Sequence, residues 1–418
     1  MKQETTFTSH QKLLIAMLAL TQFTVILDFM VMSPLGDMLM KSMNIKPGPF
    51  GLVVSAYAFS AGASGLLTAG FADRFDRKKL LVFFYSGFIL GTLCCGMAQS
   101  YPVLVAARII TGLFGGVIGS ISMAIITDLF AIELRGRVMG FLQMGFGASQ
   151  VLGIPISLYL ANRWGWEAPF FMVVAIALIV VTLIQLKMEP VNKHLALQHD
   201  RNAFLHLWHA ISKKEYRIAF AATALMSIGG FMMMPFGSAF AINNLHITAE
   251  QLPLLFMVSG VSSLFIMPTI GRVSDKVDKF AVFSAATLYL MIMVVVYTNL
   301  TPHPLWVIMI FNVLMMVGIM SRVVPGVALT TGVPDMVDRG AFMSINSSLQ
   351  QIAGGVAAAV AGVIVTQKTK ASPLEHYDTL GWVVVAVSMV SILALGRVSK
   401  MLKARTAKAS ARMAVAQD

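Results

Sequence analysis

Long apolar runs recur along the whole chain and are separated by short polar segments. Each run is about 20 residues long, and an α-helix of that length crosses a hydrocarbon core of roughly 30 Å. The runs are continuous and do not alternate with a period of two, so they predict helices and not the strands of a closed barrel. The pattern predicts twelve transmembrane helices, at residues 13–36, 50–71, 80–98, 102–127, 138–161, 168–187, 216–240, 252–273, 280–298, 305–330, 341–366 and 379–398.

A polar stretch from Glu189 to Arg217 separates six of these helices from the other six. The two sides resemble each other at a shift of about 202 residues: residues 72–77 (ADRFDR) match residues 274–279 (SDKVDK). Such a parallel repeat is typical of transporters whose substrate site lies between two related halves. We therefore predict a six-helix bundle in 1–188, a cytoplasmic linker with an amphipathic interfacial helix in 189–215, a second six-helix bundle in 216–398 and a basic tail in 399–418.

Composition and charge agree with a membrane protein. Hydrophobic residues make up 57% of the chain and charged residues 12%, against roughly 25% charged residues in a soluble domain. The net charge is +12, but 24 of the 31 Lys and Arg residues fall in the tails and alternate loops on one side. This asymmetry predicts that both termini lie in the cytoplasm. It also favours contact of the basic tail with anionic membrane lipids, and no nucleic-acid partner.

The first apolar run has the length of a full span and lacks a small-residue cleavage pattern, so we expect it to remain as the first helix. The chain is predicted to be a multi-pass protein of the bacterial cytoplasmic (inner) membrane. Small-residue spacings such as Gly112-x-x-x-Gly116 permit close helix approach, and we expect them to serve packing within a monomer.

Asp28 lies near the middle of the first run. An acid at that depth costs roughly 2.5–3.5 kcal/mol by insertion scales, so it normally faces a polar cavity or a partner and has a function. A carboxyl group that moves between an apolar and an arginine-lined environment binds and releases a proton. The alternative is a carboxylate that only pairs with a structural arginine.

No motif in the sequence indicates catalysis. Phosphate-binding loops, H-E-x-x-H and G-x-S-x-G are all absent, so the chain is not expected to be an enzyme or to carry a cofactor. No cysteine or acid cluster accompanies the histidines of this region, and we expect no metal site at His194, His199, His206 and His209. Transport would then be driven by an ion gradient or by the gradient of the substrate itself.

Residues 69–78 (AGFADRFDRK) resemble the hallmark loop between helices 2 and 3 of the major facilitator superfamily, G-x-L-A-D-R-x-G-R-K. Ala69 and Asp76 stand where the family usually has glycine, and a partial copy is present at residues 271–279. The resemblance covers nearly the entire chain. It implies an all-α membrane fold of twelve helices in two pseudo-symmetric six-helix bundles, with both termini in the cytoplasm.

Arg108, followed by Gly112, resembles the arginine signature near the start of helix 4. Together with an acid in helix 1, this pattern resembles the twelve-span drug:proton antiporters and the arabinose-efflux-permease-like group. The helix 5 antiporter signature, G-x-x-x-G-P-x-x-G, departs here to Gly153-Ile154-Pro155. The resemblance implies that Asp28 and Arg108 couple transport to protons. Position alone favours the alternative, an arginine that extends to the interface from a helix end; the family pattern reverses this preference.

Other polar and methionine side chains are candidates for a substrate cavity. Arg322 lies deep in a span, where it either binds an anionic or carbonyl-bearing substrate or pairs with backbone carbonyls freed by Pro325. The remaining candidates flank the helix 1 and helix 7 prolines or are sparse amide groups within spans: Gln22, Met30, Met32, Gln143, Gln150, Met232, Met233, Phe236, Asn346 and Gln350.

Charged residues at the predicted cytoplasmic ends of the helices resemble the family's gate, which locks one state by bridging the halves. These are Asp73, Arg77, Asp128 and Asp275. The alternative is that they only satisfy the charge asymmetry of the topology.

The sequence thus favours a secondary active transporter that exports a small amphiphilic or lipophilic compound in exchange for protons. Its expected partners are this small-molecule substrate, protons and membrane lipids. The alternative is a sugar or metabolite permease of the same fold, working as a proton symporter or uniporter. The many methionines favour varied apolar ligands over sugars.

Overall fold

The computed structural model describes residues 7–68, 74–192, 195, 203–335, 338–370 and 372–415. Within these ranges twelve helical spans are long and apolar enough to cross a membrane, as predicted. In chain order the helices are α1 (Ser9–Val31), α2 (Gly36–Met43), α3 (Pro47–Thr68), α4 (Arg77–Gly96), α5 (Tyr101–Leu129), α6 (Ile132–Ala148), η2 (Ser149–Gly153), α7 (Ile154–Trp164), α8 (Ala168–Lys187), α9 (Ala203–Ser212), α10 (Lys214–Phe231), η4 (Met234–Phe236), α11 (Gly237–Asn243), α12 (Leu252–Lys276), α13 (Lys279–Thr298), α14 (Leu305–Thr331), α15 (Arg339–Ile364) and α16 (Tyr377–Val415).

Three spans are interrupted near a proline. The first predicted span, 13–36, is α1 followed by a turn at Pro34 and the short helix α2. The seventh breaks in the same way before Pro235, where α10 gives way to η4 and α11. In the fifth, the π-helical turn η2 precedes Pro155, which lacks an N–H and would clash with the carbonyl of Val151 in a regular helix. The prolines therefore explain why these apolar runs are not single straight helices.

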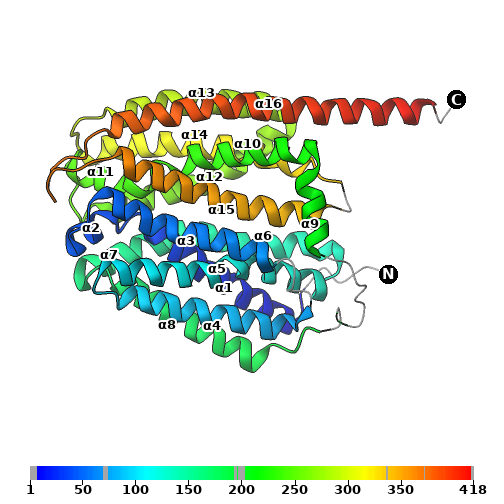
Figure 1. Ribbon diagram of the computed structural model, residues 1–418, viewed down its shortest axis with the longest axis horizontal. Coiled ribbons are helices and arrows are strands. Elements are labelled where there is room, and N and C mark those ends of the chain that lie inside the picture. The colour runs from blue at the N-terminus through cyan, green and yellow to red at the C-terminus, as the bar shows by residue number, and fades with distance from the viewer. Residues whose placement is uncertain are drawn as a thin grey trace.

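The spans form two groups that lie side by side in Figure 1, with α1 to α8 below and α10 to α16 above. Across the boundary, α3 packs along α15, and η2 and α7 pack on α12. Glycines allow this approach: a Cβ on Gly51 would lie 2.7 Å from the carbonyl oxygen of Ala358, and one on Gly62 would lie 2.8 Å from that of Ser348. The start of α1 and the end of α16 lie at the same end of the molecule (Figure 1).

Two segments outside the predicted spans are helical. The linker helix, predicted within residues 189–215, corresponds to α9, which ends at Ser212, and α10 begins at Lys214. The tail continues α16 as one helix to Val415. Arg405 on this helix forms an ion pair with Glu215 and donates to the carbonyl oxygen of Val333 at 2.7 Å. The tail is therefore in contact with the second group of helices over at least its first turns.

Candidate functional site

Asp28 and Arg108 meet inside the first group of helices. Asp28 on α1 and Arg108 on α5 are both fully buried. Nη1 of Arg108 donates to Oδ2 of Asp28 at 2.8 Å. Thr92 on α4 donates its hydroxyl to Oδ1 of Asp28 at 3.2 Å. The pair thus connects three helices in the apolar interior of one half.

The Arg108 guanidinium is held from a fourth helix as well. Its Cζ lies 4.4 Å from the centre of the Tyr57 ring of α3, within cation–π range. Its Nε has no hydrogen-bond partner among the described residues. A neutral Asp28 would leave the arginine charge without its counterion in this interior, so a change of charge on one group bears directly on the other.

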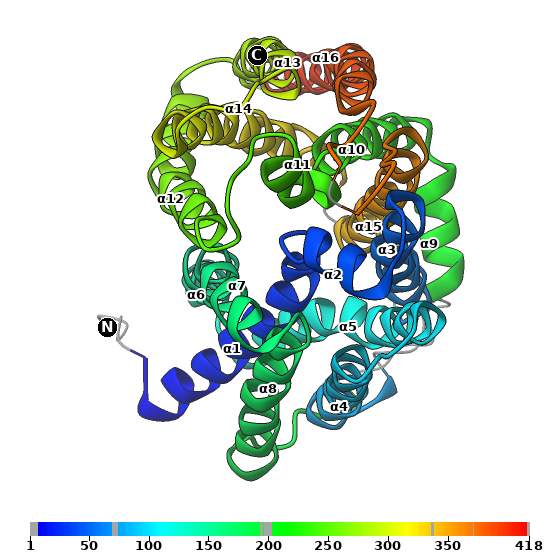
Figure 2. The same ribbon diagram turned by 90° about the vertical axis from the view of Figure 1, so that its left-hand side faces the viewer.

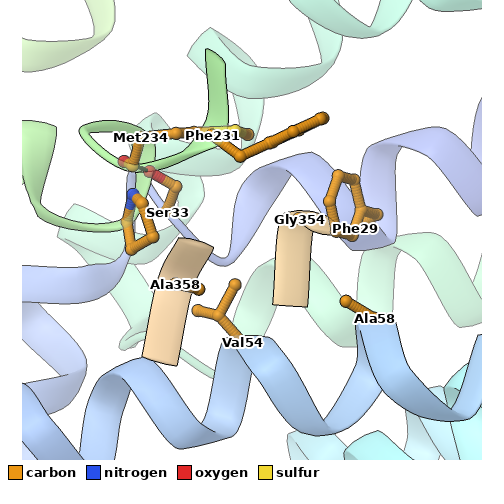
Figure 3. A pocket seen from close by; sticks show the side chains of 9 residues that line it. Phe29, Ser33, Val54, Ala58, Phe231, Met234, Gly354 and Ala358 are labelled. Carbon is orange, nitrogen blue, oxygen red and sulfur yellow. Dashed lines mark hydrogen bonds between the residues drawn. The ribbon is translucent and has the colours of Figure 1, made fainter. Parts of the chain in front are cut away.

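A small pocket lies between the two groups of helices (Figure 3). Phe29 and Ser33 enter it from α1 and the turn after α1, and Val54 and Ala58 enter it from α3. The facing wall comes from the second group. It consists of Phe231, Met234, Pro235, Gly354 and Ala358. Ser33 is the one hydroxyl in this lining, and it donates to the carbonyl oxygen of Met234, so the pocket is almost wholly apolar.

The predicted cavity residues lie around this pocket or elsewhere in the spans, and none of them lines it. Four of them are buried in the core, and each is adjacent in sequence to a residue that lines the pocket: Met30, Met32, Met232 and Phe236. Gln22 and Asn346 each have a buried side-chain oxygen without a partner among the described residues. Gln150 accepts from Ser263 across the boundary at 3.2 Å, Gln143 is exposed, and Gln350 is half-buried.

Arg322 and Met233 line a second cavity, of about 50 Å³, inside the second group. Arg322 is 2% exposed. It donates to the carbonyl oxygen of Met226 at 3.3 Å and to the hydroxyl of Ser391 at 3.4 Å. Met226 belongs to α10, so this carbonyl is not the one that Pro325 frees within α14. Arg322 thus faces a cavity and also pairs with a backbone carbonyl, and its role in binding substrate stays a prediction.

At the end of the molecule opposite the termini, polar side chains join the two groups. Figure 2 looks onto this end, with α2 and α11 near the middle. Asn243 on α11 donates to Asp37 on α2 at 2.5 Å, and Lys41 contacts both Asp37, at 2.8 Å, and Asn243, at 3.2 Å. Ser238 donates to the carbonyl oxygen of Ser33 at 2.8 Å. Asp37 and Asn243 are buried, so these contacts seal this end between the halves.

Three of the four predicted gate charges, Arg77, Asp128 and Asp275, lie at the other end. Arg77 is buried, and its Nε lies 3.3 Å from Oδ2 of Asp128, within the first group of helices. Asp275 is exposed near the end of α12. Asp73 lies outside the described residues. The interaction described here is therefore within one half, and it does not bridge the two.

Sequence reasoning did not single out Thr92, Tyr57, Ser33, Asp37 or Asn243. The hydroxyl groups gave no signal because Ser and Thr within spans usually bond to the carbonyl four residues earlier, as Thr111 does. Asp37 and Asn243 had a detectable signal: Lys41 and Asn243 are 202 residues apart, which is the shift of the internal repeat. Equivalent positions in a two-fold repeat meet where they lie near the axis.

Several proteins are similar to this chain. The uncharacterized MFS-type transporter YceJ of Bacillus subtilis (strain 168) is 26% identical over 62% of this chain and 66% of its own length. The probable sugar efflux transporter of Helicobacter acinonychis (strain Sheeba) is 23% identical over 70% of this chain and 73% of its own length. Multidrug resistance protein 2 of Bacillus subtilis (strain 168) is 23% identical over 65% of this chain and 69% of its own length.

Solved structures share the fold. The D-xylose-proton symporter has a TM-score of 0.75 at 15% identity, covering 93% of this chain and 97% of its own. A bacterial homolog of the human lysosomal transporter Spinster, in an inward-facing and unoccupied conformation, has a TM-score of 0.73 at 14% identity, covering 95% and 98%.

The sequence model of the Major Facilitator Superfamily matches residues 18–358 and 219–413, which together extend from within α1 into α16 and cover at least part of each of the twelve spans. With the repeat, the twelve helices and these structural neighbours, the chain belongs to the Major Facilitator Superfamily and is a multi-pass membrane transporter, not an enzyme.

Proposed function

We propose that this transporter is a proton-coupled antiporter that exports a small amphiphilic compound by alternating access. The observation that carries the proposal is the Asp28–Arg108 ion pair, fully buried in the middle of the first half. An intramembrane carboxylate is expensive, and such residues characteristically belong to proton pathways. Within this chain no other acid lies in the middle of an apolar run.

In this mechanism a proton on Asp28 neutralises the carboxylate and weakens its contact with Arg108. The guanidinium then needs a new partner, and Thr92 loses its charged acceptor. Because α1, α4 and α5 all contribute to the pair, a change in it alters the packing of three helices at once. Proton binding would thereby bias the half toward one of its two orientations, as any ligand with different affinity for two states does.

The pocket between the halves supports an amphiphilic rather than a sugar substrate. Its lining offers phenylalanine, methionine, valine and alanine, and the Ser33 hydroxyl is already bonded. A sugar needs several unoccupied hydrogen-bonding groups, because its buried hydroxyls would otherwise lose their water partners. Two relatives carry names that refer to sugar efflux and multidrug resistance, and both names support export.

We further propose that the termini face the cytoplasm and that the Asp37–Asn243 seal faces the outside. The basic residues gather at the end of the termini, as the positive-inside rule requires. The two bundles, 1–188 and 216–398, would then rock about the contact of α3 with α15 and of α7 with α12. The bacterial relatives support a location in the bacterial inner membrane, where a proton gradient is available. Arg77 and Asp128 would serve the gate at the inner end.

The test is transport in reconstituted vesicles with an imposed pH gradient. Three probes that stay in one charge state are used: ethidium, toluenesulfonate and D-xylose. We expect gradient-driven movement of at least one of the first two, no movement of xylose, and loss of gradient-driven movement in Asp28→Asn. Asp378→Asn, which removes an acid at a helix start, is the matched control and should retain it.

Movement of xylose by the native protein would instead support the sugar permease. Gradient-driven transport by Asp28→Asn at the native rate would remove Asp28 from the coupling mechanism and overturn the proposal.

A further inference from the structure

Arg322 is a buried cation without a counterion among the described residues. It is 2% exposed on α14, and its two hydrogen bonds, to Met226 and Ser391, are long, at 3.3 and 3.4 Å. Its Nε has no partner among the described residues, and no carboxylate among them contacts its guanidinium. The acids of residues 216–398 all lie in loops or at helix ends: Glu250, Asp275, Asp278, Asp335, Asp338, Glu375 and Asp378.

A charge in this position is costly unless something compensates it. The penalty for taking an ion out of water is several kcal/mol even after relaxation, and buried charges are normally paired. Arg108 in the other half has Asp28 for this purpose. Arg322 has two neutral oxygen atoms and the face of Phe283, at 5.9 Å. The environment of Arg322 therefore favours an anion from outside the chain.

There is room for such an anion beside the guanidinium. The cavity of about 50 Å³ lies between α10, α13, α14 and α16, which adjoin one another in the upper part of Figure 2. Gly229 leaves space for the guanidinium, since a Cβ there would lie 3.2 Å from Nη2 of Arg322 and 3.3 Å from the Ser388 hydroxyl. That hydroxyl is buried and has no partner among the described residues. A second donor is thus available next to the arginine.

The rest of the lining is apolar, and the cavity has an exposed edge. Met226, Leu290, Val294, Met315 and Ile319 form its walls. Gly230, at the border, is exposed. The cavity lies next to the pocket between the halves, at the break after α10. Met233 lines the cavity, and the following residue, Met234, lines the pocket. An anionic group at Arg322 would therefore have its apolar remainder within reach of the central pocket.

We propose that Arg322 and Ser388 bind the carboxylate of an amphiphilic, singly charged organic anion, and that this is the substrate class. A guanidinium pairs with a carboxylate through two parallel hydrogen bonds. One guanidinium balances one negative charge, so a dianion such as a phosphate monoester would bring an uncompensated charge into an apolar cavity. The assignment of the ligand as transported substrate rests on the proposed function, whereas the binding site itself does not.

Equilibrium binding tests the site without a proton gradient. The thermal stability of the purified full-length protein is measured with benzoate, with its neutral and cationic counterparts benzamide and benzylammonium, and with sodium chloride. A ligand that binds the folded state raises the melting temperature by mass action. We expect stabilisation by benzoate, and little or none by the other three.

Three variants locate the effect. Arg322→Gln should weaken benzoate binding by at least about tenfold, since it removes a charge-assisted contact. Arg272→Gln, an exposed arginine of the same half, should bind as the native protein does. Gly230→Val keeps the charge and obstructs the edge of the cavity; no atom lies within 4 Å of its Cβ position, so we expect it to fold and to bind benzoate more weakly.

Native-like benzoate binding in Arg322→Gln would overturn the proposal, as would equal stabilisation by benzoate and benzamide. Equal stabilisation by chloride would make the site one for an inorganic ion and not for an organic substrate. If benzoate binds at Arg322 but Asp28→Asn still couples transport to protons, the binding site stands and the proposed antiport mechanism falls. If ethidium is exported in a proton-coupled way and benzoate does not bind, the proposed antiport mechanism stands and the proposed anion site falls.

Discussion

The Asp28–Arg108 pair places opposite charges in contact inside an apolar bundle, with Thr92 and Tyr57 completing their surroundings. Two well-packed neutral side chains of similar volume often make a protein at least as stable as a buried ion pair does, so stability alone does not require the pair. We propose that one member of the pair changes charge during transport. Arg322 differs from Arg108, because no carboxylate among the described residues contacts its guanidinium.

A double-mutant cycle measures the pair directly. Asp28→Asn and Arg108→Gln should each destabilise the protein by about 3–5 kcal/mol, because each leaves one buried charge unpaired. The double variant should recover most of this loss while remaining uncoupled. Thermal or denaturant unfolding in one detergent checks the prediction; additive losses in the double variant would mean that the two groups do not depend on each other.

Single residues were only partly predictable. Asp28 and Arg108 were visible because a charge in an apolar run is rare. Their contact required the arrangement of helices, which the family resemblance supplied. Thr92 and Ser388 were not visible, because a hydroxyl in a span carries no signal of its own. Thr92 donates to a residue of another helix, and the Ser388 hydroxyl has no partner among the described residues.

At the scale of elements, apolar run length predicted the number of spans, and most ends fall within a few residues of the helices observed. The first and last spans were exceptions. The predicted end at residue 36 runs past the turn at Pro34 into α2, and α16 continues beyond the predicted end at residue 398 to Val415. Hydropathy does not register a change of direction, since the residues on both sides of such a turn are equally apolar. The break in the seventh span and the π-helical turn η2 escaped notice for the same reason.

The contact between α3 and α15 depends on glycine. Gly51→Ala would place its Cβ 2.7 Å from the Ala358 carbonyl oxygen, so one helix must shift. We expect a loss of about 1–3 kcal/mol of stability, the usual cost of overpacking. Gly140→Ala, whose Cβ would meet nothing within 4 Å, is the control and should be neutral or slightly stabilising. Melting temperatures of the two variants compare them; equal values would argue against tight packing here.

The tail helix depends on contacts at its first turns. The Lys403 ammonium holds the pKa of Asp278 below its ordinary value, so this contact persists at neutral pH and is lost only as the pH falls through the lowered pKa.

Arg405→Ala removes the ion pair with Glu215 and the bond to Val333. Amide hydrogen exchange in α16 beyond Lys403 should then accelerate. Lys400→Ala, at an exposed position of the same helix, should leave it unchanged.

At the scale of the whole molecule, the internal repeat predicted two related groups of helices, and the contacts at the seal follow from it. Lys41 and Asn243 occupy equivalent positions and meet across the boundary. The sequence did not show which end of the molecule is closed, because this depends on the balance of such contacts at the two ends. The contacts between α2 and α11 close the molecule on that side.

Asn243→Ala should shift that balance. Asp37 would lose its donor from the other half, and an unsatisfied buried group costs about 1–3 kcal/mol. Spin labels at Lys46 and Glu250, on loops of opposite halves, should report a larger population of long distances. Asn299→Ala, which removes a bond within its own helix, is the control. Unchanged distance distributions in Asn243→Ala would show that the seal does not determine the state.

We propose that Asp28 itself gains and loses the proton that drives transport. Infrared difference spectroscopy of the reconstituted protein, recorded on a pH change between about 5 and 9, detects the C=O stretch of a buried carboxylic acid as it forms. We expect a carboxylic acid band that is present in the native protein and absent in Asp28→Asn. The same band at full intensity in Asp28→Asn would show that another group binds the proton.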